Sequence, residues 1–295
     1  LCNPNRLSGK AVINAKEKTD ITCVLDYGDF ASAAELELGV ISKGEYKERL
    51  ELENEIIKTC DYFSVTNEPI KTRIKNQGKS GDIFVKIPNG VNVSEFSDLN
   101  PEKILKKYNL NNGKKKVIFS GTLNKSKGID TFLRSIPFVE YDNFEAVLTG
   151  ERDLKKWKKM VRDEKLDRNA NVNFLGLIER DDIPALFAAG DVGTAPFEES
   201  EFSNYSCPLK ITEFFAAGLP VVASGLLGIR ELVDDKVTGL IIEPGDEKSL
   251  ASAITKVLSN DELALKISKN EKKKAKEYSW KNLITNLEDF FKSKI

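Results

Sequence analysis

The sequence predicts an α/β protein in which a doubly wound parallel sheet is preceded by a smaller, partial α/β domain. The second half of the chain alternates regularly between short apolar runs and amphipathic segments. The composition, 40% hydrophobic and 31% charged, is typical of a globular protein, and the length of 295 residues suggests two domains or one large one. A polar, turn-rich stretch separates the two parts. We therefore expect a partial N-terminal domain at 1–95, a complete C-terminal domain at 96–279 and a closing helix at 280–295.

The N-terminal part supplies three predicted strands and two helices. An apolar run at 21–25 is the strand expected within residues 11–30, and 31–58 reads as one helix with apolar positions among many charges. A strand at 62–66, a helix at 68–76 and a strand at 82–88 follow. Residues 89–101 are the expected linker.

The C-terminal part begins a regular strand–helix alternation near Lys116. The predicted strands are 117–120, 144–148, 172–175, 192–195, 221–223 and 240–242. The predicted helices are 129–138, 154–164, 183–188, 210–217, 229–233, 247–259, 263–276 and 280–291. Each strand is short and almost wholly apolar, which is typical of a parallel sheet covered on both faces. These elements make one Rossmann-like domain, but no G-x-G-x-x-G follows a strand, so a dinucleotide oxidoreductase is not supported.

Composition excludes several kinds of chemistry. The chain has no histidine, so Ser-His-Asp catalysis and His-ligated metals are excluded for it. The net charge of −1 gives no reason to expect nucleic acid as a partner. The four cysteines have no C-x-x-C spacing, which argues against zinc and favours a reducing compartment. They are Cys2, Cys23, Cys60 and Cys207.

Targeting features are also missing from the sequence. No apolar run is long enough to span a membrane, and no signal peptide is visible. The first residue is Leu rather than Met, so we expect a processed protein or a fragment. We expect a cytoplasmic protein. Lysine clusters at 114–116, 155–159 and 272–276 allow either a solvated surface or contact with acidic lipid.

The segment 206–224 has the chemistry of an anion site. A helix that starts just after Pro208 presents unbonded backbone N–H groups and the positive end of its dipole. Lys210 lies in its first turn, where a cation is unfavourable unless an anion binds nearby. A diphosphate at the helix start, with Glu213 beside it for sugar hydroxyls, would explain both side chains. The alternative is an ordinary αβ unit in which Lys210 and Glu213 are solvated.

Three stretches together resemble GT-B glycosyltransferases, specifically the retaining group known as glycosyltransferase family 4. Residues 206–224 resemble the donor-site helix and strand of that family. Residues 118–128 resemble its first strand and phosphate loop, and 228–246 resemble its closing helix and strand. The resemblance covers roughly residue 61 to the end of the chain. It implies a GT-B fold whose final helix, 280–295, crosses back to the N-terminal domain.

The resemblance also implies roles for particular residues. Lys127 and Lys210 would hold the diphosphate without a metal, since no Asp-x-Asp motif is present, and Glu213 would bond the ribose hydroxyls. These three are the expected catalytic residues. The other expected donor contacts are Gly121, Thr122, Gly176, Leu177, Asn204, Tyr205, Ser206, Cys207, Pro208, Leu209 and Ile211. No cofactor and no metal is expected, and the donor would be a UDP- or GDP-linked sugar.

The chain departs from the family pattern at three places. Thr122 stands where an Arg often follows the first strand, and Tyr205 stands where many members have a first Glu. Only the last portion of an N-terminal GT-B domain is recognisable before the linker. The acceptor would therefore be recognised by residues outside this chain or by a partner chain that completes the domain.

The leading hypothesis is a metal-independent, retaining transferase acting on a glycan or glycolipid acceptor, with peripheral contact at the inner face of a membrane. A non-catalytic nucleotide-sugar-binding module, or a subunit of a split enzyme, is the main alternative. An epimerase or phosphorylase of the same architecture is a weaker one, because the residues that those reactions need are not recognisable here.

Overall fold

The computed structural model describes residues 3–4, 6–110 and 113–294, and Cys2 lies outside them. The chain divides into two compact units. Unit 1 comprises Leu1–Gly90, Ser200–Cys207 and Trp280–Ile295, and unit 2 comprises Val91–Glu199 and Pro208–Ser279. The chain therefore changes unit between Gly90 and Val91, five residues before the boundary expected from the turn-rich stretch. The octapeptide Ser200–Cys207 belongs to unit 1 although both of its flanks belong to unit 2.

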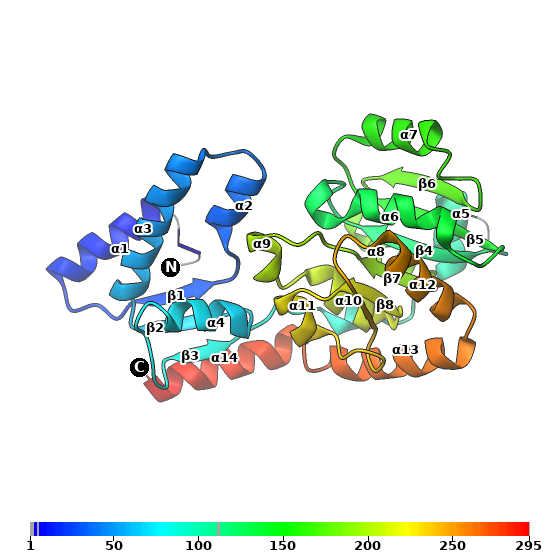
Figure 1. The fold of residues 1–295 in the computed structure, drawn as a ribbon. Helices are drawn as coiled ribbons and strands as arrows, with labels where there is room; N and C mark the ends of the chain where they lie inside the picture. Colours follow the sequence, from blue (N-terminus) through cyan, green and yellow to red (C-terminus); the bar gives the residue numbers. More distant parts are fainter. Residues whose placement is uncertain (1–2, 5, 111–112, 295) are drawn as a thin grey trace. The chain divides into compact units, whose positions relative to one another are not determined.

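Unit 2 is built on one parallel sheet (Figure 1). Within the described residues its six strands are β4 (Lys115–Ser120), β5 (Phe144–Thr149), β6 (Asn171–Gly176), β7 (Val192–Ala195), β8 (Val221–Ser224) and β9 (Leu240–Ile242). Their spatial order is β6-β5-β4-β7-β8-β9, and every pair is parallel. This is the strand order of the doubly wound fold, so the alternation in the sequence predicted the sheet correctly.

Helices cover both faces of this sheet. The helices of unit 2 are α5 (Pro101–Lys107), α6 (Ile129–Ser135), α7 (Leu154–Asp163), α8 (Ile183–Ala188), α10 (Leu209–Ala217), α11 (Leu227–Leu232), α12 (Glu247–Leu258) and α13 (Asp261–Ala275). Short 3₁₀ turns are η1 (Val93–Phe96), η2 (Lys125–Lys127), η3 (Ile136–Phe138) and η4 (Arg180–Asp182). One core joins apolar side chains of α6, α7 and α12 to the sheet, among them Phe132 and Trp157. On α8 and α10, Phe187 and Phe214 pack edge to face with ring centroids 4.8 Å apart.

Unit 1 has a smaller parallel sheet in the order β1-β2-β3. Its strands are β1 (Val24–Tyr27), β2 (Tyr62–Val65) and β3 (Phe84–Lys86). Its helices are α1 (Arg6–Lys18), α2 (Ala31–Glu37), α3 (Lys43–Thr59), α4 (Glu68–Lys75), α9 (Glu201–Asn204) and α14 (Trp280–Lys294). Leu25, Phe63 and Ile70 are fully buried in its core, so the unit has an apolar centre of its own.

Two expectations for the N-terminal part were wrong in detail, namely the single helix at 31–58 and the bounds of the first strand. The single helix expected over 31–58 is two helices, because Gly39 adopts a left-handed φ of 69° and Ser42 starts a new capping box with Glu45. The strand expected at 21–25 lies at Val24–Tyr27, and α1 occupies a stretch for which no helix was expected. Within the expected linker, Val91 forms an isolated bridge with Ser279, and α5 begins at Pro101 with Asn100 as its cap.

Candidate functional site

The candidate site of unit 2 lies at the carboxyl ends of its two central strands. From β4 the chain moves outward to β5 and β6, and then returns to β7 on the other side of β4. Open α/β sheets bind ligands in the crevice where the strand order reverses in this way. Gly121 directly follows β4, and Phe197 follows β7 after Pro196. Gly121, one of the expected donor contacts, is therefore placed where this topology favours a ligand.

Lys210 is the most unusual side chain at this place. It lies in the first turn of α10, and its Nζ is buried without a hydrogen-bond partner among the described residues. The Nζ atom is 4.8 Å from the ring centroid of Phe119 and 5.2 Å from that of Phe197. Ring faces attract a cation, but by much less than its lost hydration. Lys210 is thus a buried amine whose Nζ has no hydrogen-bonding anion among the described residues.

The surroundings of Lys210 lower its pKa to about 7. Burial is the main cause, because it penalises the charged form, and repulsion from Lys127 adds to it. Attraction to Glu213 offsets only part of the shift. A bound anion would reverse both unfavourable effects, so this pocket favours a negatively charged ligand.

Lys127 approaches the same aromatic ring from the loop after β4. Its Nζ is 4.5 Å from the ring centroid of Phe197. The side chain of Asn124 caps the short turn η2 by accepting a hydrogen bond of 3.0 Å from the backbone N of Lys127. The structure therefore brings Lys127 and Lys210 together around Phe197, a residue that the sequence interpretation did not single out.

Glycines let the loops at this edge approach backbone to backbone. Gly128 has a φ of 74°, and a Cβ there would overlap the carbonyl of Pro196. Gly121 has a φ of 119°, and a Cβ there would lie 3.4 Å from Nζ of Lys210. Glycine is required at such positions because other residues rarely adopt positive φ values. The backbone at Gly121 thus lies directly against the ammonium of Lys210.

A pocket of about 350 Å³ opens beside Gly121. Its lining residues are Ser120, Gly121, Thr122, Thr149, Gly150, Glu151, Leu177, Ile178 and Ile183. Of the expected donor contacts, Gly121, Thr122 and Leu177 line it, and Leu177 is 69% exposed. Gly176 instead supports the wall: its carbonyl accepts hydrogen bonds of 2.8 Å from Gly150 N and 3.1 Å from Thr149 Oγ1.

Glu213 lies one turn after Lys210 and is paired. Its Oε1 is 2.7 Å from Nη1 of Arg180, whose side chain is 62% exposed while that of Glu213 is 7% exposed. Burial raises the pKa of Glu213, and the charge of Arg180 opposes that rise. Arg180 was not expected at the site, because it stands in a charged run with no motif around it.

One backbone N–H group in the first turn of α10 is already hydrogen-bonded within the turn. Pro208 is the N-cap, and Ile211 N donates a hydrogen bond of 3.1 Å to Pro208 O. The Ile211 side chain is fully buried, whereas Leu209 is exposed. The amide of Ile211 therefore has a partner within the chain.

The remaining expected donor contacts belong to unit 1. They are Asn204, Tyr205, Ser206 and Cys207. The ring of Tyr205 packs edge to face on Phe30 at 5.3 Å, and its carbonyl accepts a hydrogen bond of 2.7 Å from Asn67 Nδ2. The carbonyl of Cys207 accepts one of 2.5 Å from Asn89 Nδ2. Within unit 1 these contacts hold the octapeptide by its backbone and by the Tyr205 ring.

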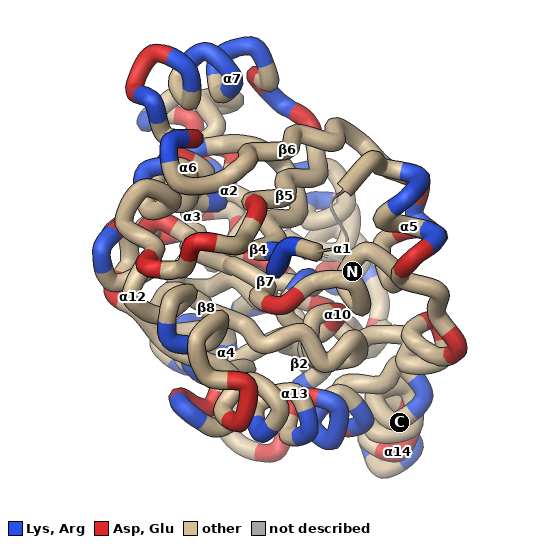
Figure 2. Tube along the Cα trace, turned by 90° about the vertical axis from the view of Figure 1, so that its right-hand side faces the viewer, with Lys and Arg blue, Asp and Glu red and all other residues tan. Residues whose placement is uncertain are grey.

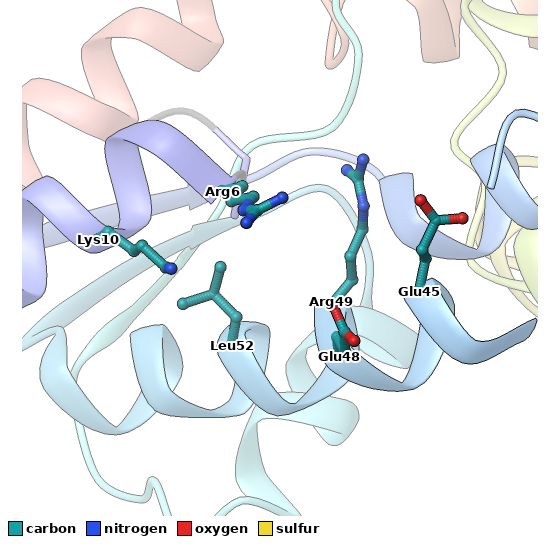
Figure 3. A pocket seen from close by; sticks show the side chains of 6 residues that line it. All are labelled: Arg6, Lys10, Glu45, Glu48, Arg49 and Leu52. Carbon is teal, nitrogen blue, oxygen red and sulfur yellow. The ribbon is translucent and has the colours of Figure 1, made fainter. Parts of the chain in front are cut away.

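Unit 1 contains a small hollow of about 140 Å³ between α1 and α3 (Figure 3). Its lining residues are Arg6, Lys10, Glu45, Glu48, Arg49 and Leu52. Figure 3 shows cations and carboxylates around the same space, and Arg49 is paired with Glu35 at 2.6 Å. The mixed charge gives this hollow no preference for an anion comparable with that of Lys210.

A larger space of about 580 Å³ in unit 1 lies between the three-stranded sheet and α14. Trp280, Leu287 and Phe291 line it from the helix, and Asp26 and Ser64 line it from the strands. No lysine or arginine is among its lining residues in the described part of the chain. A diphosphate would find no cation there.

Two further structural facts concern metals and membranes. Among residues 3–4, 6–110 and 113–294, no three His, Cys, Asp or Glu side chains gather in a way that could hold a metal ion. In the same residues no helix has the length and apolar character needed to cross a bilayer.

Comparison with protein families and curated proteins gives consistent matches. The family model described as glycosyl transferases group 1 matches residues 100–274. An uncharacterized glycosyltransferase of Methanocaldococcus jannaschii is 30% identical over 242 residues, covering 80% of this chain and 57% of that protein. A phosphatidyl-myo-inositol mannosyltransferase of Mycobacterium leprae is 29% identical, covering 68% of this chain and 51% of that protein. The chain thus spans about half the length of the curated relatives that it matches.

Solved structures share the fold. Sucrose-phosphate synthase from Thermosynechococcus elongatus matches with a TM-score of 0.81 and 21% identity, over 99% of this chain and 72% of that one. Anabaena HepE in complex with UDP-glucose matches with a TM-score of 0.74 and 20% identity, over 97% of this chain and 76% of that one. The chain accordingly has the α/β GT-B fold.

Proposed function

Since the chain belongs to the glycosyl transferases group 1 family, we propose that unit 2 binds the nucleotide diphosphate of a sugar donor for glycosyl transfer. The observation that carries this proposal is the buried ammonium of Lys210, which has no hydrogen-bond partner in the described chain. It lies at the strand-order reversal of the sheet, beside Gly121 and close to Lys127. A diphosphate supplies the hydrogen-bonding anion that Lys210 lacks, and it lies within the field of Lys127.

The other donor contacts follow from the position of the diphosphate. Glu213 accepts hydrogen bonds from the ribose hydroxyls, and the base lies against Leu177 in the pocket beside Gly121. HepE of Anabaena was crystallised with UDP and with UDP-glucose, which supports uridine as the first nucleoside to try. GDP is the second candidate.

We propose that transfer is metal-independent and retains the anomeric configuration. The bond between the sugar C1 and the diphosphate oxygen breaks, and the leaving diphosphate gains negative charge that Lys210 and Lys127 stabilise. The acceptor oxygen bonds to C1 on the same face, and its proton passes to the departing phosphate oxygen. This route uses no protein base, which suits a chain without histidine.

The acceptor is proposed to be a glycan or a lipid-linked glycan. The Mycobacterium leprae relative is named for a phospholipid acceptor. Figure 2 shows basic residues along α7 and α13 of unit 2, and α7 carries Lys155, Lys156, Lys158 and Lys159. A lysine-rich helix such as α7 is attracted to anionic lipid, so peripheral contact with a membrane is part of the proposal.

Calorimetry with UDP, GDP and ADP tests donor binding. We expect Lys210→Ala and Glu213→Ala each to weaken binding of the preferred nucleotide by about 2–4 kcal/mol, or ~30- to 1,000-fold. The matched control is Lys256→Ala, which removes an exposed lysine of α12 and should leave affinity unchanged. Unchanged affinity in both site variants would contradict the site. Binding without hydrolysis or transfer of the sugar would favour a non-catalytic module over an enzyme.

A further inference from the structure

We propose that Arg180 is a positioning residue for Glu213, holding its buried carboxylate ionised and oriented to accept the hydroxyl groups of the donor ribose. This inference rests on the proposed function and adds a residue to it. Arg180 acts through Glu213 rather than on the sugar that is transferred.

The first support is the geometry of the pair. Nη1 of Arg180 is 2.7 Å from Oε1 of Glu213. The carboxylate is almost fully buried, whereas the arginine side chain is largely exposed. Holding a mostly exposed arginine against an interior carboxylate costs side-chain entropy. The pair therefore forms best if the backbone of η4 already places Arg180 close to Glu213.

The second support is the way in which η4 is anchored. The carboxylates of Glu179 and Asp182, at the two ends of η4, pair with Lys107 at the end of α5. The Nζ atom of Lys107 lies 2.9 Å from Glu179 and 2.6 Å from Asp182. Tyr108 donates a hydrogen bond of 2.5 Å to Asp182. Because Asp182 and Glu179 are tied to α5, the turn is fixed with Arg180 directed at α10. The exposed pairs add little stability individually, but together they set the direction of the turn.

The third support is the charge environment of Glu213. Burial raises its pKa, and repulsion from Glu95 in η1 raises it further. The groups that oppose the rise are Arg180, which acts most strongly, and Lys210 on α10. An ionised carboxylate can accept hydrogen bonds from both ribose hydroxyls, whereas a protonated carboxyl keeps one oxygen as a donor. Removing Arg180 therefore favours the form of Glu213 that binds ribose less well.

The experiment compares Arg180→Gln with the wild type by calorimetry across pH 6–8.5, using UDP and inorganic diphosphate as probes. Arg180→Gln should weaken UDP binding ~10- to 100-fold where Glu213 is protonated, and the loss should become smaller as rising pH ionises the carboxyl. Affinity for diphosphate should be unchanged, because that probe has no ribose. Because the pKa of Lys210 responds to the charge of Glu213, the contribution of Lys210 is measured separately with diphosphate at each pH.

Two further variants separate positioning from folding. Arg180→Lys should recover most of the affinity, since it restores a cation near Glu213. In a Glu213→Gln background, Arg180→Gln should cost little more, because the two residues act as one unit. Arg168→Gln is the matched control, as it removes an exposed arginine and should change nothing.

The outcomes distinguish this inference from the proposed function. A wild-type chain that binds no nucleoside diphosphate would contradict both. Wild-type binding with an Arg180→Gln variant equal to it at every pH would overturn only the role of Arg180. An equal, pH-independent loss for UDP and diphosphate would likewise overturn it, because a general effect of charge or folding would then explain the result.

Discussion

Lys210 combines two features that are individually unfavourable, a cation in the first turn of a helix and an ammonium buried between aromatic rings. Neither stabilises the empty protein. Both favour an anion in front of α10, because the anion supplies the missing partner of the ammonium and complements the helix dipole.

The shifted pKa of Lys210 predicts a pH dependence of UDP binding. In the free protein this pKa is lowered to about 7, and the proposed diphosphate would raise it, because a nearby anion favours the charged form. Below pH 7 the ammonium is already charged, so Lys210 contributes no pH dependence there. Above pH 7 binding must take up a proton, and affinity should fall up to ~10-fold per pH unit until the pKa of the complex is reached. Calorimetry in buffers of different ionisation enthalpy measures the proton taken up.

Lys210→Arg is the companion variant for that measurement. Arginine stays charged throughout this range, so proton uptake on binding should disappear. Uptake of a proton by the arginine variant at pH 8 would show that another group titrates.

At the level of elements, the loop between β4 and α6 depends on Gly128. Gly128→Ala combines a left-handed φ with overlap of the Pro196 carbonyl. The φ alone costs about 1–2 kcal/mol, and the overlap must add to this by displacing the loop after β7. We expect a lower Tm and weaker UDP binding, measured by thermal melts and calorimetry.

Gly176→Ala is the matched control for stability. It has a similar φ of 72° but no atom within 4 Å of the added Cβ. Its cost should be limited to the backbone conformation. If both variants lose the same stability, the close approach of the two loops contributes nothing.

Most strands of unit 2 were predictable because nearly all of their side chains are buried, and buried strands appear in the sequence as short apolar runs. β5 is buried at every position, and β7 and β8 likewise, so short apolar runs marked them reliably. In unit 1 the helices are rich in charge, and in α1 only Gly9 is buried. A weak apolar periodicity gave no sign of α1 and hid the break at Gly39.

The site was predictable only where its residues share one local motif. Lys210 and Glu213 lie on one helix and Lys127 in one loop, so spacing along the chain was informative. Phe197 and Arg180 join them through the order of strands in the sheet and the packing of α8 on α10, which no local pattern reveals. The placement of Ser200–Cys207 in unit 1 depends on partners more than 100 positions away, such as Asn67 and Asn89.

On the scale of the whole molecule, one buried carboxyl links pH to the stability of unit 2. Glu271 on α13 is fully buried, and its Oε1 accepts a hydrogen bond of 3.0 Å from Val221 N at the start of β8. Burial raises its pKa well above the ordinary value of 4.5. The folded state therefore holds this proton more tightly than the unfolded state.

The sign of the effect follows from that difference. The contribution of Glu271 to the free energy of unfolding is complete below pH 4.5, the ordinary pKa of the group. It decreases as the pH rises toward the pKa in the folded state, by at most about 1.4 kcal/mol per pH unit. Glu271→Gln keeps the acceptor for Val221 and removes the titration. The variant should gain stability relative to the wild type between pH 5 and 8 in denaturant titrations. A constant difference across that range would exclude Glu271 as the titrating group.

The octapeptide Ser200–Cys207 determines how the two units can be expressed as separate proteins. Unit 1 is assembled from three separate stretches of the gene, so no single start and stop codon can express it alone. A truncation that deletes residues 1–90 would leave Tyr205 without Phe30 and Asn67, and α14 without the strands on which it packs. An independent version of unit 2 therefore has to end before Trp280 and replace eight internal residues with a polar linker from Glu199 to Pro208.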